Sequence, residues 1–219
     1  MTNQQIPGGV SVIIPAYQAA NTIGRALASV AAQSVKPAQV IVVDDGSSDG
    51  TLEMAEQMRP AMAGIELKII GQENKGAGAA RNRALKEATQ DYVAFLDADD
   101  EWMAEKIERS LYHMEGTENL FVAHDFVQRG EDGSEKTIKC AAHFRAAADP
   151  YVGLYRTGFV GSITVLAKRQ AIEAVGGFDE SLLTGQDFDL WLSLLESPQA
   201  KFAVFAEELS RYHINASGI

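Results

Sequence analysis

The chain has 219 residues, of which 46% are hydrophobic and 22% charged, ordinary values for one globular domain with a substantial core. Its formal net charge of −11 argues against an extensive basic surface for nucleic acid or anionic lipid and leaves only a local basic patch open, so we expect no nucleic-acid partner. The one cysteine, Cys140, excludes an intrachain disulfide and a multi-cysteine metal site, and we expect it to be a small buried apolar residue.

The first half of the chain alternates short apolar runs with helical patterns. The apolar runs are typical of strands buried on both faces of a parallel sheet, and they cover residues 10–14, 40–43, 67–70 and 92–96. Apolar residues at helical spacing predict helices over residues 22–33, 51–58, 79–88 and 101–114. This alternation predicts right-handed βαβ units and a doubly wound α/β sheet.

The second half is less regular. Residues 120–127 and 135–140 flank Glu131-Asp132-Gly133-Ser134, which predicts a hairpin with an Asp-Gly turn. Residues 141–156 have little periodicity, and we expect a mobile loop there that becomes ordered when a ligand binds. A further strand and two helices are predicted, in chain order, over residues 162–167, 169–175 and 187–196.

Two groups of carboxylates follow predicted strands. Asp44 and Asp45 come after the second strand, and Asp97, Asp99 and Asp100 come after the fourth. Ligands of open α/β sheets bind at the carboxyl ends of the strands, so both groups lie where a site is expected. Helix capping accounts for one acid in each place, but adjacent carboxylates repel each other unless a cation or hydrogen-bond donors meet them. Carboxylate oxygens suit Mg²⁺ or Mn²⁺.

The third strand–helix junction, residues 74–82, is rich in glycine and carries Lys75 and Arg81. A glycine-rich turn that opens a helix exposes backbone N–H groups, and the two cations add positive charge, so the junction suits a diphosphate. Taken by itself the pattern is weak, because Gly76 and Gly78 also fit a plain tight turn.

In this order, the segments resemble the family 2 inverting glycosyltransferases of the GT-A fold over nearly the whole chain. The segments that carry the resemblance are VIIPAY (12–17), VVDDGSSDGT (42–51), ARN (80–82), FLDADD (95–100), GFDE (177–180) and QD (186–187). The resemblance implies an α/β GT-A fold, with a doubly wound, mostly parallel sheet, helices on both faces and a small C-terminal acceptor-side part. We therefore expect a single domain over 1–219, with a nucleotide-sugar-binding half (1–114) and an acceptor-side half (115–219).

The same resemblance implies a role for each matching residue. The donor-binding residues would be Pro15, Ala16, Tyr17, Asp45, Lys75, Arg81 and Asp97. Among them, Asp45 would bond the base, Arg81 would hold the base or the diphosphate with Lys75 nearby, and Asp97 would touch the ribose. Asp99 would bind Mn²⁺ or Mg²⁺, with His213 as a further ligand.

The family's general base matches Asp187. Its rival two residues on, Asp189, is better explained as an acid favoured by the helix dipole. The implied activity is a metal-dependent, inverting, hexosyl-type transfer from a nucleotide diphosphate donor, with UDP-sugar as the commonest type. The acceptor would be a glycan or a lipid-linked molecule.

Two alternatives stay open. A nucleotidyltransferase would want a glycine-rich, basic loop after the first strand, and residues 15–18 do not provide one. A non-catalytic sugar-nucleotide binder or assembly protein is favoured by Gln186, where the family usually has Glu, and by the early end at Ile219. No charged-then-apolar signal pattern opens the sequence, so we expect a cytoplasmic protein, with peripheral attachment to the inner face of the membrane as an option. The sequence predicts no oligomeric state.

Overall fold

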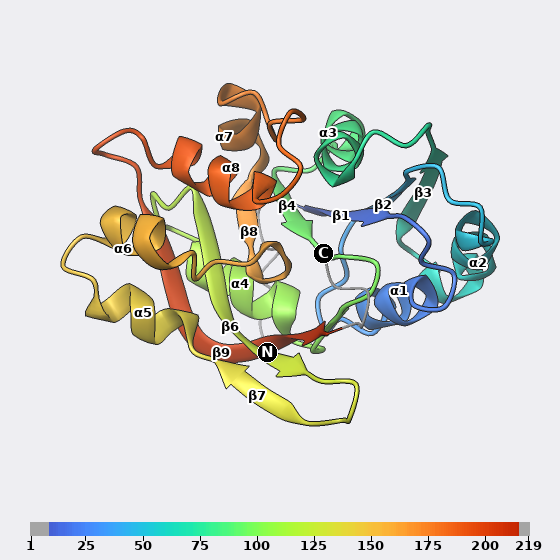
Figure 1. The fold of residues 1–219 in the computed structure, drawn as a ribbon, viewed down its shortest axis with the longest axis horizontal. Coiled ribbons are helices and arrows are strands. Elements are labelled where there is room, and N and C mark those ends of the chain that lie inside the picture. The colour runs from blue at the N-terminus through green and yellow to red at the C-terminus, as the bar shows by residue number, and fades with distance from the viewer. Residues whose placement is uncertain (1–8, 215–219) are drawn as a thin grey trace.

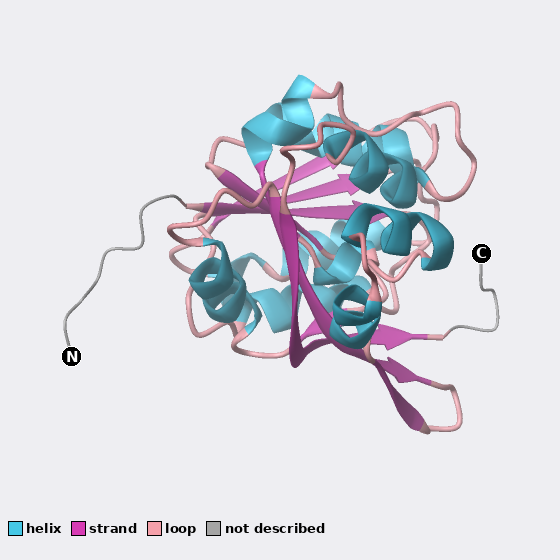
Figure 2. Cartoon of the chain, turned by 90° about the vertical axis from the view of Figure 1, so that its left-hand side faces the viewer, coloured by secondary structure: helices cyan, strands magenta, loops and turns pink. Residues whose placement is uncertain are grey.

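A nine-stranded mixed sheet runs through the molecule (Figure 1). The computed structural model describes residues 9–214. The strands follow the order β3-β2-β1-β4-β8-β6-β9-β5, and β7 pairs with the far part of β6. Helices cover both faces of this sheet (Figure 2).

The N-terminal half confirms the predicted alternation of strand and helix. Four parallel neighbours form it: β1 (Val10–Ala16), β2 (Gln39–Asp44), β3 (Glu66–Gly71) and β4 (Tyr92–Phe95). The connecting helices are α1 (Ile23–Ala31), α2 (Thr51–Gln57) and α3 (Ala77–Glu87), with a 3₁₀ turn η1 (Arg59–Met62) before β3. Strands β1 and β2 are buried along nearly their whole length, as continuous apolar runs require.

The C-terminal half adds antiparallel pairing. Its strands are β5 (Glu101–Trp102), β6 (Phe121–Arg129), β7 (Glu135–Ile138), β8 (Leu166–Lys168) and β9 (Phe202–His213). Its helices are α4 (Lys106–Met114), α5 (Cys140–Ala146), α6 (Pro150–Thr157), α7 (Arg169–Ala174) and α8 (Gln186–Leu194), with a 3₁₀ turn η2 (Ser162–Thr164). Strand β8 is antiparallel to β4 and β6, whereas β9 is parallel to β6 and antiparallel to β5.

Three predictions, one at the end of the first half and two in the second, were wrong in part. The helix expected over 101–114 begins only at Lys106, because Glu101 and Trp102 pair with β9 instead. The mobile loop expected over 141–156 is two helices, since residues 140–146 pack on β6 and β9 and Asp149 caps α6. The strand expected over 162–167 is a 3₁₀ turn followed by the three-residue β8.

The core has two layers, one on each face of the sheet. Helices α3, α5, α6, α7 and α8 contribute to one layer, whose largest fully buried side chain is Trp191. Helices α1, α2 and α4 contribute to the other layer. Cys140 is buried in the first layer, as predicted, and burial raises the pKa of its thiol to about 12. Among the described residues, no helix combines the length and the apolar character needed to cross a membrane.

Candidate functional site

A cleft of about 370 Å³ opens beside the carboxyl end of β4. Its walls come from the start of α3, the residues after β4, the turn η2, the start of α8 and the end of β9. The lining includes Arg81, Asp97, Ser162, Gln186, Asp187 and Tyr212. The cleft therefore joins the predicted donor side, at Arg81 and Asp97, to the predicted base, Asp187.

An ion pair forms one wall of this cleft. Arg81 Nη2 lies 2.6 Å from Asp97 Oδ1, and the Ser162 hydroxyl donates to Asp97 Oδ2 at 3.2 Å. The guanidinium also lies over the Phe178 ring, 5.6 Å from its centroid. Arg81 projects from the first turns of α3, which Gly76 opens with φ +92°, a value that favours glycine. The ion pair therefore fixes the positively charged guanidinium of Arg81 at one position in the cleft.

Asp187 lies in the first turn of α8, after Gly185 with φ +74°. Its Oδ1 accepts the N–H of Phe188 at 2.9 Å. Burial raises the pKa of Asp187, while Arg81 and a backbone hydrogen bond from Ser162 act in the opposite direction. A half-buried carboxylate with a raised pKa beside a cation is suited to accept a proton.

Asp45, the residue predicted to bind the nucleobase, accepts hydrogen bonds from the loop that precedes α3. Its Oδ1 accepts from Gln72 Nε2 at 2.7 Å and from the Lys75 N–H at 3.0 Å, and its Oδ2 accepts the Gly76 N–H at 2.7 Å. Asp45 is 3% exposed. These contacts hold the glycine-rich junction against β2, whereas the Lys75 side chain is exposed. Neither Asp45 nor Lys75 lines the cleft of Arg81 and Asp187.

The other predicted donor residues lie at the carboxyl end of β1, with Pro15 and Ala16 in the strand and Tyr17 directly after it. Pro15 is half-buried, Ala16 is buried, and Tyr17 is exposed. The Asp45 N–H donates to the Ala16 carbonyl at 2.8 Å, so this strand end lies next to the end of β2. Gln18 follows with φ 50°, a strained value for a non-glycine residue, and its N–H donates to Ser47 Oγ at 2.9 Å. The β1 and β2 ends are thus tied together.

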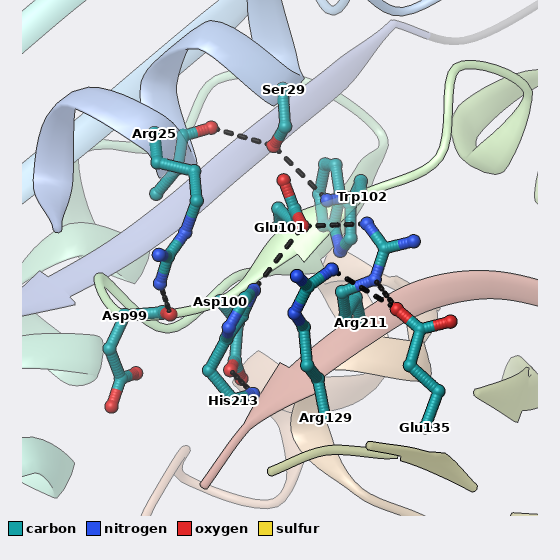
Figure 3. Close-up of polar contacts among 11 residues, drawn as sticks. Arg25, Ser29, Asp99, Asp100, Glu101, Trp102, Arg129, Glu135, Arg211 and His213 are labelled. Atoms are coloured by element: carbon teal, nitrogen blue, oxygen red, sulfur yellow. Dashed lines mark hydrogen bonds and ion pairs between the residues drawn. The ribbon is translucent and has the colours of Figure 1, made fainter. Parts of the chain in front are cut away.

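The acidic loop after β4 is held by buried contacts (Figure 3). The Arg25 guanidinium donates to the Asp99 carbonyl. Asp100 is fully buried, its Oδ1 accepts the His213 N–H at 2.8 Å, and its Oδ2 has no partner within residues 9–214. Burial, with Asp97 and Asp99 close by, raises the pKa of Asp100 to about 9. Three carboxyl groups are therefore crowded at this strand end.

His213 lies on the far side of this loop from the cleft. Its Nε2 lies 3.2 Å from Glu101 Oε1, burial lowers its pKa, and its side chain lines a second cavity of about 410 Å³ with Arg25 and Arg129. Figure 3 shows the Asp99 carboxylate directed away from the imidazole of His213. The structure does not bring these two predicted metal ligands together.

Within residues 9–214, no group of three or more acidic, His or Cys side chains is arranged to hold a metal ion. A Mg²⁺ ion that binds together with a phosphorylated substrate needs fewer protein ligands, since one or two carboxylates and the substrate's phosphates complete its coordination. Asp97 and Asp99 are the candidates for these carboxylates, since Asp100 is fully buried, and a cation there would relieve the repulsion among the three acids. The donor set is oxygen, which suits Mg²⁺ or Mn²⁺.

Sequence reasoning gave no role to three residues that shape the site. Ser162 bonds Asp97, and Arg25 bonds the Asp99 backbone, and no local pattern marks either residue. Asn82 was visible in the ARN motif: its Oδ1 accepts the Phe178 N–H at 2.9 Å, and its Nδ2 donates to the Phe178 carbonyl at 2.8 Å. The amide therefore joins α3 to the GFDE segment.

Gln186 is buried and donates to the Leu182 carbonyl at 2.7 Å.

The chain is similar to known glycosyltransferases. The family model "Glycosyl transferase family 2" matches residues 11–175. The amylovoran biosynthesis glycosyltransferase AmsB of Erwinia amylovora is 34% identical over 212 residues, 93% of this chain and 69% of that protein. The Escherichia coli protein WfgD, named UDP-Glc:alpha-D-GlcNAc-diphosphoundecaprenol beta-1,3-glucosyltransferase, is 30% identical, covering 96% of this chain and 79% of its own length.

Two solved structures share the fold at 22% identity. Staphylococcus aureus TarS 1-349 in complex with UDP-GlcNAc has a TM-score of 0.74 over 95% of this chain and 59% of its own. The Pyrobaculum calidifontis mannosyltransferase PcManGT in complex with GDP-Man and Mn²⁺ has a TM-score of 0.75 over 96% and 58%. The chain thus spans somewhat over half the length of these structures. By sequence match and by its GT-A fold, the chain belongs to glycosyltransferase family 2.

Proposed function

We propose that the chain is a metal-dependent inverting glycosyltransferase that moves a sugar from a nucleotide diphosphate donor, of the UDP-sugar type, to a glycan or lipid-linked acceptor. The observation that carries the proposal is the cleft that contains both the Arg81–Asp97 ion pair and the half-buried Asp187. Relatives support the substrate classes: WfgD is named for UDP-Glc and a diphosphoundecaprenol acceptor, and TarS was solved with UDP-GlcNAc.

In this proposal, residues 1–114 bind the donor. Pro15, Ala16 and Tyr17 line the pocket of the nucleobase and ribose. Asp45 bonds the base, which requires exchange of at least one of its present contacts with the 72–76 loop. Asp97 faces the ribose. All these residues lie at or directly after the carboxyl ends of β1, β2 and β4, where an open α/β sheet binds ligands.

Arg81, Lys75 and the amides at the start of α3 would meet the diphosphate. As the bond between the sugar and the phosphate breaks, negative charge grows on the leaving group. A buried cation that is already fixed in place stabilises this charge without reorganising. Asp99 would hold a divalent ion, and His213 would join it only by leaving Glu101. Such an ion, when bound, neutralises charge on both phosphates.

Residues 115–219 would bind the acceptor. Asp187 would take the proton from the acceptor hydroxyl while that oxygen attacks the anomeric carbon from the face opposite the leaving diphosphate. One new carbon–oxygen bond replaces the bond to phosphate, and the anomeric configuration inverts. The raised pKa of Asp187 favours proton uptake.

A thermal-shift screen of UDP-, GDP- and dTDP-sugars, with Mn²⁺ or with EDTA, tests the donor and the metal. We expect UDP-sugars to raise the unfolding temperature in Mn²⁺, because a ligand stabilises the state it binds, by about 2.7 kcal/mol at 100 times its Kd. Asp99→Asn should remove the Mn²⁺-dependent part of the shift. Asp91→Asn, at the opposite end of β4, is the matched control. Equal shifts in Mn²⁺ and EDTA would refute the metal dependence.

The second candidate is a non-catalytic sugar-nucleotide binder, which a neutral Gln186 beside Asp187 favours. Transfer is measured directly by incubating the chain with UDP-sugar and extracted lipid-linked acceptors. Donor binding without transfer or donor hydrolysis, in both the wild type and Asp187→Asn, would establish the binder in place of the enzyme.

A further inference from the structure

Helix α6 turns most of its large apolar side chains outward. Tyr151, Val152 and Tyr155 are 38%, 39% and 64% exposed, and they lie on one side of the helix because Tyr155 stands four positions after Tyr151 and three after Val152. Leu154 is the residue of this helix that is fully buried. Exposed single apolar residues are ordinary, but three on one helix face form a patch that indicates an interaction.

The helix is firmly built despite its exposure. Asp149 Oδ1 accepts the N–H groups of Tyr151 and Val152 at 2.9 and 3.2 Å, and Pro150 occupies the first helical position. Gly158, with φ +57°, ends the helix, and its N–H donates to the Leu154 carbonyl at 2.8 Å. Since both ends are capped, the outward face of α6 is a stable feature of the fold.

The segment that forms α5 and α6 is basic, whereas the whole chain is acidic. Residues 139–158 carry three basic side chains and one acidic one: Lys139, Arg145 and Arg156 against Asp149, the N-cap. All three basic residues are exposed, whereas the whole chain has a net charge of −11. We call the exposed faces of α5 and α6, with Tyr151, Val152, Tyr155 and these cations, the α6 patch. It combines tyrosines with positive charge.

We propose that the α6 patch binds the surface of a bilayer that contains anionic phospholipid. Tyrosine prefers the boundary between lipid and water, and basic side chains are attracted to anionic headgroups. The small size of the patch favours a membrane over a protein partner. An eight-residue helix is ~12 Å long, whereas a stable protein interface buries about 800 Å² on each side. Shallow insertion into headgroups needs only the apolar face of one helix.

The position of α6 connects the patch to the proposed reaction, and this step rests on the proposed function. The helix ends at Thr157, and η2 begins at Ser162, which bonds Asp97 in the cleft. Five residues span at most roughly 17 Å. An acceptor sugar joined to a lipid through a diphosphate stays near the headgroups, so a patch at this distance brings the cleft to its acceptor.

Cosedimentation of the whole chain with vesicles tests the proposal without donor or acceptor. We expect binding to phosphatidylglycerol–phosphatidylcholine vesicles, and weaker, salt-insensitive binding to pure phosphatidylcholine. The Tyr151→Ser/Tyr155→Ser double variant should bind about tenfold more weakly. Arg145→Gln and Arg156→Gln should each weaken binding about fivefold, an effect that high salt removes. Tyr112→Ser is the matched control, because Tyr112 is 67% exposed on α4, which packs on the other face of the sheet.

Each outcome separates the patch from the proposed function. If wild type and the double variant bind anionic vesicles equally, or neither binds, the α6 patch is not a membrane surface, even when UDP-sugar still binds. Vesicle binding without any nucleotide binding keeps the patch and removes the glycosyltransferase proposal. Sedimentation velocity tests whether a second copy of the chain covers the patch instead. A dimer that dissociates in the double variant would make the patch an interface between two copies and overturn the membrane assignment. Thermal unfolding of each variant confirms that it folds.

Discussion

The guanidinium of Arg81 and the carboxylate of Asp97 lie 2.6 Å apart on the wall of the cleft, with Ser162 on the other oxygen of Asp97. The ion pair fixes the positive charge of Arg81 beside the carboxyl end of β4, where several acidic side chains lie. Two predictions about the site and two about the scaffold follow from contacts of this kind.

Arg81→Met should reduce affinity for UDP at least tenfold. The change removes the cation proposed to meet the diphosphate, and it leaves Asp97 unpaired close to a negatively charged ligand. Isothermal titration calorimetry measures the effect. Arg83→Met is the control, since Arg83 is half-exposed on the same helix and pairs with Glu87 at 3.1 Å. Equal affinity for UDP in the two variants would rule out a donor-binding role for Arg81.

Asp187→Asn should reduce kcat by a factor of about 10² to 10⁴ while UDP binding stays close to that of the wild type. Burial raises the pKa of Asp187, so in the wild type the acid limb of kcat/KM should lie above the ordinary value of 3.8, with activity lost as pH falls through it. Asp189→Asn, two residues further along the same helix, is the control and should stay within a fewfold of wild type. A larger loss of kcat in Asp189→Asn than in Asp187→Asn would make Asp189 the general base in place of Asp187.

Gly177→Ala should destabilise the fold more than Gly176→Ala. Both residues have positive φ, +82° and +89°, so both substitutions strain the backbone by about 1 kcal/mol. A Cβ on Gly177 would also lie 2.5 Å from Asn82 Oδ1, the atom that accepts the Phe178 N–H, whereas a Cβ on Gly176 meets nothing within 4 Å. Urea unfolding should separate the two variants by a further ~1 kcal/mol. Similar midpoints would mean that Asn82 moves away freely.

Lys106 should make stability depend on pH. It is fully buried, its Nζ donates to the Val165 carbonyl at 3.0 Å and lies 4.2 Å from the Trp102 ring centroid, and burial lowers its pKa to about 7 from 10.5. Between these pH values the unfolded chain binds more protons than the folded one, so the free energy of unfolding rises with pH.

From pH 7 to pH 9 the rise contributed by Lys106 should be about 2 kcal/mol. Urea unfolding of Lys106→Met at both pH values measures it, because this variant keeps the apolar stem and has no charge to titrate. Wild type should gain stability relative to Lys106→Met over this interval. Parallel changes in the two proteins would show that Lys106 keeps its proton in the folded state.

The first half of the fold was predictable because three of its strands, β1, β2 and β4, are largely buried. Val40–Val43 has no polar face, and this is typical of parallel strands between two helical layers. The edge strand β3 is half-buried and carries Lys68, so the expectation of burial on both faces was wrong there. The second half was not predictable. Trp102, Ile107 and Leu111 fit helical spacing, yet Glu101–Trp102 pairs with Arg211 and Ser210, a contact more than 100 residues away in sequence. Strand β9 was not predicted, since Glu207 and Glu208 interrupt its apolar pattern.

The candidate site divides in the same way. Arg81, Asp97 and Asp187 were singled out from short motifs, and the structure brings them into one cleft, while their chemical roles stay predictions. Asp45 and Lys75 lie outside that cleft, and the Asp99 carboxylate is directed away from His213. Ser162 and Arg25 had no visible signal, because a single serine or arginine acquires its partner only when distant segments meet.

By itself, the sequence determined the parallel half of the sheet, the strand ends that carry carboxylates and the family of the chain. Local pattern is enough for these features, because burial on both faces and ligand-binding loops leave their mark on consecutive residues. Only the tertiary structure decided that η2 joins Asp97 to Asp187, that Lys106 lies beneath this turn, and that α6 faces outward. These contacts and exposures depend on how segments far apart in the chain pack against one another, and no local sequence pattern records that packing.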